Sequence, residues 1–113
     1  MDFEQYQSLA SRTAGTFPSW KEEAQCWALG LTGESGEVAD LIKKSLYHGH
    51  VLKSDKLANE LGDVLWYLTM MAKTFGYSLE DIASANIEKL RKRYPDGFSE
   101  KASRERELSV EEQ

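Results

Sequence analysis

The 113-residue sequence has a single cysteine, two prolines and no long hydrophobic run. Cys26 has no second cysteine to pair with, so a disulfide-stapled secreted fold is excluded and a reducing cytoplasm is the expected compartment. Between Pro18 and Pro95 no proline interrupts a helix. The longest strongly apolar run, residues 64–72, is far shorter than the roughly 20 residues that span a bilayer. We therefore expect no membrane partner.

The sequence also lacks an excess of positive charge. Its 19 acidic residues outweigh 14 lysines and arginines, which gives a net charge of −5. A protein that binds the phosphate backbone of a nucleic acid usually has a broad basic face, so we expect no nucleic-acid partner. Hydrophobic residues make up 41% of the chain, which is enough for a folded core in a single domain.

Apolar residues recur at three- and four-residue steps in four segments, which is the period of one helix face. Glycine, proline or a polar break separates the segments from one another. The pattern predicts helices over about 2–12, 20–47, 54–75 and 78–94. Ser19 is a candidate N-cap for the second helix, with Glu22 at the capping-box position. No segment alternates with period two, so the predicted fold class is all-α.

Charged residues crowd the end of the chain beyond Phe98. Ala102, Leu108 and Val110 are the only clearly apolar residues in that stretch. We therefore expect one helical domain over residues 1–98, followed by a charged, loosely ordered tail over residues 99–113.

Two pairs of acidic residues lie beside the apolar stripes of the second and third predicted helices. Glu34 and Glu37 are three residues apart, and Glu60 and Asp63 repeat that spacing. If the two helices pack through their stripes, four carboxylates converge, and their repulsion requires a cation. Oxygen-only ligation favours Mg²⁺, with Mn²⁺ as a possible substitute. The alternative is that these acids are ordinary charges on solvated helix faces.

Glycines accompany both acidic pairs. A glycine inside a helix costs about 1 kcal/mol relative to alanine, so several together indicate a close approach of helices or room for a ligand. The residues concerned are Gly30, Gly33, Gly36 and Gly62.

The segments around the acids, Leu31–Asp40 and Glu60–Tyr67, resemble the paired ExxE and ExxD motifs of the MazG-like, all-α nucleoside triphosphate pyrophosphohydrolases. A third segment, Asn86–Pro95, is similar to the closing helix of that family. The resemblance covers roughly Trp20 to Phe98 and includes three separated motifs in the right order. It implies a four-helix bundle-like protomer that assembles into a homodimer or a homotetramer.

The same resemblance implies an enzyme that cleaves a nucleoside triphosphate, an NTP or dNTP, to the monophosphate and pyrophosphate. Its implied metal ligands are the four acids Glu34, Glu37, Glu60 and Asp63. Glu37 is slightly favoured over Glu34 as the catalytic carboxylate that accepts the proton of the attacking water. The implied role is the control of nucleotide pools or the clearing of noncanonical nucleotides.

Three residues of the closing segment are candidate phosphate ligands. Asn86 and Lys89 are three residues apart on one face, and Arg93 lies one turn further along. Lysine offers a point charge and arginine a fork of donors to phosphate oxygens. The alternative for Lys89 and Arg93 is a solvated basic helix end.

Aromatic residues near the motifs are candidates for stacking against the nucleobase. Packing in the core is the alternative for each of them. The candidates are Trp20, Trp27, Trp66 and Tyr67.

Other polar residues near the motifs are given structural interpretations. Cys26 is interpreted as a packing residue, His48 and His50 as loop residues, and Lys43 and Lys44 as solvated side chains.

Two alternatives to this enzyme remain open from the sequence. One is a noncatalytic helical module in which the acids hold a structural cation or bind a basic partner. The other is a phosphoribosyl-ATP pyrophosphohydrolase, which uses the same metal chemistry. The presence of all four acids together with Asn86 and Lys89 favours an enzyme over a module.

Overall fold

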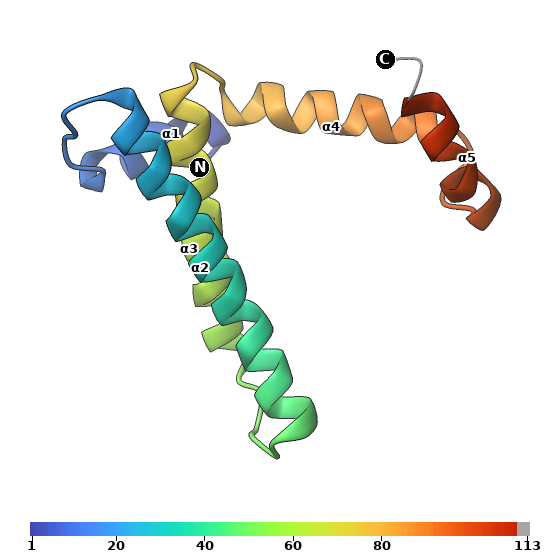
Figure 1. The fold of residues 1–113 in the computed structure, drawn as a ribbon, viewed down its shortest axis with the longest axis horizontal. Helices are drawn as coiled ribbons and strands as arrows, with labels where there is room; N and C mark the ends of the chain where they lie inside the picture. The colour runs from blue at the N-terminus through green and yellow to red at the C-terminus, as the bar shows by residue number, and fades with distance from the viewer. Residues whose placement is uncertain (111–113) are drawn as a thin grey trace. The chain divides into compact units, whose positions relative to one another are not determined.

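A computed structural model describes residues 1–110 of the chain, with side chains described through Arg106. Every regular element in that range is helical, which confirms the all-α class (Figure 1). None of these helices is both long enough and apolar enough to cross a membrane. The elements are α1 (Phe3–Ala10), the short 3₁₀ helix η1 (Ser11–Thr13), α2 (Trp20–Tyr47), α3 (Ser54–Thr74), α4 (Leu79–Arg93) and α5 (Glu100–Val110).

The four helices predicted from periodicity are present, with ends within about two residues of those expected. Ser19 is the N-cap residue of α2, as predicted, but it does not cap through its side chain. Its hydroxyl donates to the Glu22 carboxylate at 3.3 Å instead of accepting from a backbone N–H. The fold therefore keeps the predicted start of α2 without the predicted capping box.

The chain divides into two compact units, one of residues 1–79 and one that begins at Glu80. In the first unit, α2 and α3 lie side by side along much of their length (Figure 1). The core of this unit is formed by Ala10 of α1, Trp27 of α2 and Met70 of α3. The Trp66 ring meets the Trp27 ring edge-on, with centroids 5.3 Å apart. One end of the α2–α3 pair is thus packed under α1.

Polar contacts fix the packed end of the first unit. The Trp27 indole N–H donates to the Thr74 hydroxyl at 3.0 Å and to the Glu23 carboxylate at 3.3 Å, which ties α2 to the end of α3. The Gln7 side chain of α1 donates to the Tyr77 carbonyl at 3.1 Å and accepts from the Leu79 N–H at 3.2 Å. A buried indole N–H therefore has partners, as desolvation requires.

A close approach between helices is built at Gly30. A Cβ atom at this position would overlap the Tyr67 ring, so the absence of a side chain lets that ring lie directly on α2. The predicted close approach is thus present at Gly30. The space beside Gly33, Gly36 and Gly62 is open.

In the second unit, a turn at Pro95–Gly97 connects α4 to α5, and Gly97 takes a φ of 89° that side chains rarely adopt. Residues 100–110 form a helix where the sequence predicted a loosely ordered tail, and residues 111–113 of that tail lie outside the described residues. The apolar pattern is weak in α5, but the Ser99 hydroxyl accepts from the Ala102 N–H at 3.1 Å as a cap. Two ion pairs spaced four residues apart, Lys101–Glu105 and Arg104–Glu100, add local support.

Candidate functional site

Three of the four predicted metal ligands come together between α2 and α3. One carboxylate oxygen from each of Glu34, Glu60 and Asp63 lies within 4.8 Å of the other two. All three side chains are half-buried. Glu34 is supplied by α2, whereas Glu60 and Asp63 lie one turn apart on α3. The convergence predicted from the two i, i+3 spacings is therefore present for these three residues.

The electrostatics of this cluster are those of crowded carboxylates. The pKa of Glu34 is raised above its ordinary value, first by a hydrogen bond with the Glu60 carboxyl and then by burial. The negative charges of Asp63, Glu60 and Glu37 add to the increase. The crowding therefore favours the protonated form of Glu34 more than it would in an isolated glutamate. A divalent cation would relieve the same repulsion.

Glu37, the fourth predicted ligand, is exposed and lies outside the three-acid group. It is close enough for its charge to raise the pKa of Glu34 on the same helix and that of Lys44. Glu37 is thus an acid at the margin of the cluster.

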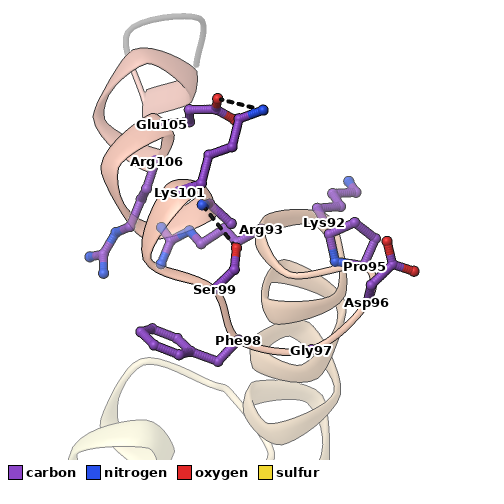
Figure 2. A pocket seen from close by; sticks show the side chains of 11 residues that line it. Lys92, Arg93, Pro95, Asp96, Gly97, Phe98, Ser99, Lys101, Glu105 and Arg106 are labelled. Carbon is purple, nitrogen blue, oxygen red and sulfur yellow. Dashed lines mark hydrogen bonds and ion pairs between the residues drawn. The ribbon is translucent and has the colours of Figure 1, made fainter.

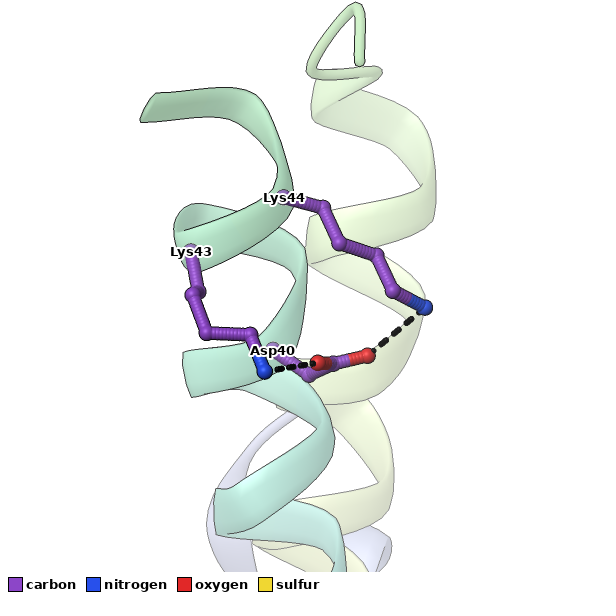
Figure 3. A network of polar contacts seen from close by, with 3 residues as sticks. All are labelled: Asp40, Lys43 and Lys44. Atoms are coloured by element: carbon purple, nitrogen blue, oxygen red, sulfur yellow. Dashed lines mark ion pairs between the residues drawn. The ribbon is translucent and has the colours of Figure 1, made fainter. Parts of the chain in front are cut away.

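A basic network lies one turn beyond Glu37 on α2 (Figure 3). Asp40 accepts from Lys44 at 2.8 Å and from Lys43 at 3.3 Å. The hydrogen bond from Lys44 lowers the pKa of Asp40, and the same bond raises the pKa of Lys44. The two lysines are therefore held by Asp40 in addition to being partly solvated.

Tyr6 of α1 is a neighbour of the cluster that sequence reasoning missed. Burial raises the pKa of its phenol, and the negative charge of Asp63 raises it further. Tyr6 also packs against the core formed by Ala10, Trp27 and Met70. In the sequence, Tyr6 is one member of an apolar stripe, and no spacing relates it to Asp63.

The predicted phosphate ligands Asn86, Lys89 and Arg93 lie on α4, almost all of which belongs to the second unit. Asn86 and Lys89 are exposed, and Arg93 is half-buried. They follow one another at three- and four-residue steps, so they share one face of that helix, as the sequence predicted.

The four aromatic candidates have different environments. Trp27 is only 2% exposed and lies in the core, which is the alternative considered for it. Trp66 and Tyr67 are half-buried, and the Trp66 indole N–H donates to the Ala10 carbonyl at 3.1 Å. Trp20 is 58% exposed; its ring and that of Phe75 meet in a T-shaped pair with centroids 6.0 Å apart, and the Lys21 Nζ lies 6.0 Å from the centroid of the Trp20 ring. Trp20 thus presents the most open ring of the four.

The predictions for Cys26 and for the two histidines have different outcomes. Cys26 is exposed, so its interpretation as a packing residue is wrong; its neighbour Trp27 occupies the inward-facing position. His48 and His50 are exposed residues after the end of α2, where both backbone N–H groups donate to the Lys44 carbonyl at 3.1 Å. Their assignment to a loop is confirmed.

Comparison with known sequences identifies similar proteins over most of the chain. Residues 22–98 match the family described as the MazG nucleotide pyrophosphohydrolase domain. The chain is also 37% identical over 73 residues to the Gene 37 protein of Mycobacterium phage L5. That match covers 61% of this chain, which spans 64% of the length of the phage protein. No solved structure gave a significant match.

Proposed function

The chain belongs to the MazG nucleotide pyrophosphohydrolase family, and from this membership we propose that it hydrolyses an NTP or dNTP to the monophosphate and pyrophosphate. The observation that carries the proposal is the group formed by Glu34, Glu60 and Asp63, whose ligand atoms lie within 4.8 Å of one another. The expected role is the control of nucleotide pools or the removal of noncanonical nucleotides.

The donor set of this group fits a hard divalent cation. Its three half-buried carboxylates offer only oxygen ligands. The pKa of Glu34 is raised first by its hydrogen bond with Glu60 and by burial, and then by the neighbouring negative charges, which a cation would offset. We propose Mg²⁺, with Mn²⁺ as a substitute, held by Glu34, Glu60 and Asp63. When bound, such an ion would neutralise the triphosphate and lower the pKa of the attacking water.

The attacking water must lose a proton, and a carboxylate oxygen that does not bind the metal can accept it. Glu37 fits this role better than Glu34, because it lies at the margin of the cluster and outside the group of three. In the proposed step, the water oxygen bonds to the α-phosphorus and Glu37 accepts the proton. The bond between the α-phosphorus and the oxygen that bridges to the β-phosphate breaks, and pyrophosphate leaves.

The remaining contacts to the substrate are proposed from side-chain chemistry. Asn86, Lys89 and Arg93 carry donors suited to phosphate oxygens, and they share one face of α4. For the base we propose Trp20, because its ring is the most open of the candidate aromatics.

We also propose that the protein assembles into a homodimer or a homotetramer. On α2 and α3, Leu29 is 75% exposed and Leu61 is 50% exposed, and large apolar side chains in water favour association. Light scattering coupled to size-exclusion chromatography measures the mass directly. A single species of 12.8 kDa, the mass of one chain, would contradict the proposed oligomer.

The proposed reaction is tested with a panel of canonical and modified nucleoside triphosphates in the presence of Mg²⁺. We expect pyrophosphate and the monophosphate as the primary products, and no turnover in EDTA. Phosphoribosyl-ATP belongs in the same panel, because its cleavage would identify a different substrate class. Orthophosphate as the primary product would contradict the proposed position of cleavage.

A further inference from the structure

A separate pocket lies wholly within the second unit, between the end of α4 and the beginning of α5 (Figure 2). We call it the α4–α5 pocket; its lining runs from Lys92 to Arg106 and includes the turn at residues 95–99. Its volume is about 910 Å³, which is within the range of sites that take small molecules. None of the three clustered acids contributes to it.

The lining of this pocket is basic although the chain as a whole carries a net charge of −5. Its charged residues are the four cations Lys92, Arg93, Lys101 and Arg106 and the two anions Asp96 and Glu105. The pairing of Lys101 with Glu105 is long, at 4.0 Å. Lys92 and Arg93 form no ion pair with any side chain in residues 1–106. The pocket therefore has positive charge that a bound anion can neutralise.

An exposed aromatic ring also lines the α4–α5 pocket. Phe98 lines the pocket and is 75% exposed, with its ring centroid 5.4 Å from that of Tyr94. In Figure 2 the guanidinium groups of Arg93 and Arg106 extend to the same side of the ribbon as the Phe98 ring, whereas Asp96 extends to the other side. Two guanidinium groups can each donate paired hydrogen bonds to a phosphate, and the exposed Phe98 ring can stack against a base. Together they suit a ligand that has both a phosphate and a flat base.

The turn that carries Phe98 is well defined. The Gly97 N–H donates to the Tyr94 carbonyl at 3.1 Å, and Gly97 has a positive φ of 89°. The Tyr94 N–H in turn donates to the Leu90 carbonyl at 2.8 Å, so the turn continues directly from α4. A hydrogen-bonded turn therefore places Phe98 next to the cations.

From these observations we infer that the α4–α5 pocket binds a phosphorylated nucleoside, with its phosphate on Arg93 and Arg106 and its base against Phe98. This binding needs no divalent ion, because the side chains themselves supply the positive charge. The inference goes beyond the proposed hydrolysis and does not depend on the three-acid group. Arg93 is also one of the contacts proposed for the substrate, so Arg106 and Phe98, which have no role in that reaction, carry the test that separates the two proposals.

The two helices provide matched controls for the test. On α4, Arg93 lines the pocket, whereas Arg91 does not and pairs with Glu88 at 3.8 Å. On α5, Arg106 lines it, whereas Arg104 does not and pairs with Glu100 at 4.0 Å. Each pair lies on one helix, so the same substitution changes the net charge equally inside and outside the pocket.

The experiment is calorimetric titration of the full chain with adenosine monophosphate and with inorganic pyrophosphate, both in EDTA. We expect both to bind, and we expect Arg106→Met or Arg93→Met to weaken each affinity by about tenfold or more. Arg104→Met and Arg91→Met should stay within about twofold of the unsubstituted protein. Phe98→Leu should weaken the monophosphate and leave pyrophosphate binding unchanged, because only the monophosphate has a base to stack.

Three results would overturn this inference: no binding in EDTA, equal losses in the pocket and control arginine variants, or equal losses of both ligands in Phe98→Leu. Asp63→Asn separates it from the proposed hydrolysis. That variant should lose pyrophosphate release and still bind adenosine monophosphate in EDTA. A loss of that binding in Asp63→Asn would contradict a pocket independent of the acids.

Discussion

The two ends of the α2–α3 pair are built differently. At the end under α1, Trp27 and Met70 are 2% and 1% exposed. At the far end, Tyr47 and Val51 are 79% and 84% exposed. The three-acid group of Glu34, Glu60 and Asp63 lies between these ends in sequence on both helices. The packed end can thus hold the three acids in place, while the exposed end leaves them open to solvent and ligand.

The spacing along each helix explains how the packed end positions the acids. Glu34 follows Trp27 by seven residues on α2, and Asp63 precedes Met70 by seven on α3. Seven residues are about two helical turns, or roughly 10 Å. Once Trp27 and Met70 share the core, the two acids are brought to the same level of the pair. Repulsion between the carboxylates opposes this arrangement, so the apolar end must supply the stability.

The largest expected effect comes from removing the packed end. Trp27→Ala takes a nearly fully buried indole out of the core and should lower the free energy of unfolding by about 3–5 kcal/mol. Tyr47→Ala at the exposed end is the control and should change it by no more than about 0.5 kcal/mol. Urea unfolding followed by circular dichroism measures both. A similar loss at Tyr47 would show that the far end is not open in solution.

The next effect tests the acids between the two ends. Asp63→Asn should reduce pyrophosphate release by about 100-fold or more, because even residues that only orient metal ligands contribute about 10–100-fold. The neutral amide also removes repulsion, so the melting temperature in EDTA should hold or rise. Asp55→Asn, an exposed acid in the first turn of α3, is the control and should keep its activity. An Asp63→Asn protein with full activity would contradict the proposed site.

A smaller effect is expected at the close approach of the two helices. In Gly30→Ala the added Cβ overlaps the Tyr67 ring, which must move, and such overpacking costs about 1–3 kcal/mol. Gly33→Ala is the matched control, because a Cβ there meets open space and alanine favours a helix by up to about 1 kcal/mol. The two substitutions should therefore shift the melting temperature in opposite directions. A stabilised Gly30→Ala would contradict the packing of Tyr67 on α2.

Much of the fold could be predicted from local sequence. The bounds of α2 and α3 follow from apolar periodicity and from the breaks at Ser19, His48 and Gly76. α5 could not be predicted in that way, because its support comes from the Ser99 cap and from ion pairs rather than from an apolar stripe. Periodicity detects helices that bury a face and misses those that do not.

Part of the candidate site could also be predicted from the sequence. The i, i+3 spacing placed Glu60 and Asp63 on one face, and the pairing of two stripes brought Glu34 to them. The marginal position of Glu37 and the approach of Tyr6 to Asp63 depend on how α1 and α2 are rotated against α3. That rotation is set by packing such as Tyr67 on Gly30, which no spacing within a single helix encodes.

The smallest expected effect is the pH dependence of the protein without metal. The pKa of Glu34 is raised above 4.5 in the folded state, first by its hydrogen bond with Glu60, so the folded state holds this proton more tightly than the unfolded state. Stability must then fall as the pH rises from 4.5 through the raised pKa. Asp40 acts in a separate window, because its lowered pKa makes stability fall only as the pH drops below 3.8.

Glu34→Gln isolates this contribution, because glutamine does not titrate. In EDTA, the melting temperature of the unsubstituted protein should decline relative to that of Glu34→Gln between pH 4.5 and neutral pH. Millimolar Mg²⁺ should reverse the decline, since an ion that binds only the folded state stabilises it by mass action. NaCl at matched ionic strength should do so only weakly. Equal curves for the two proteins, or equal responses to Mg²⁺ and NaCl, would contradict a crowded carboxylate group between the packed and open ends.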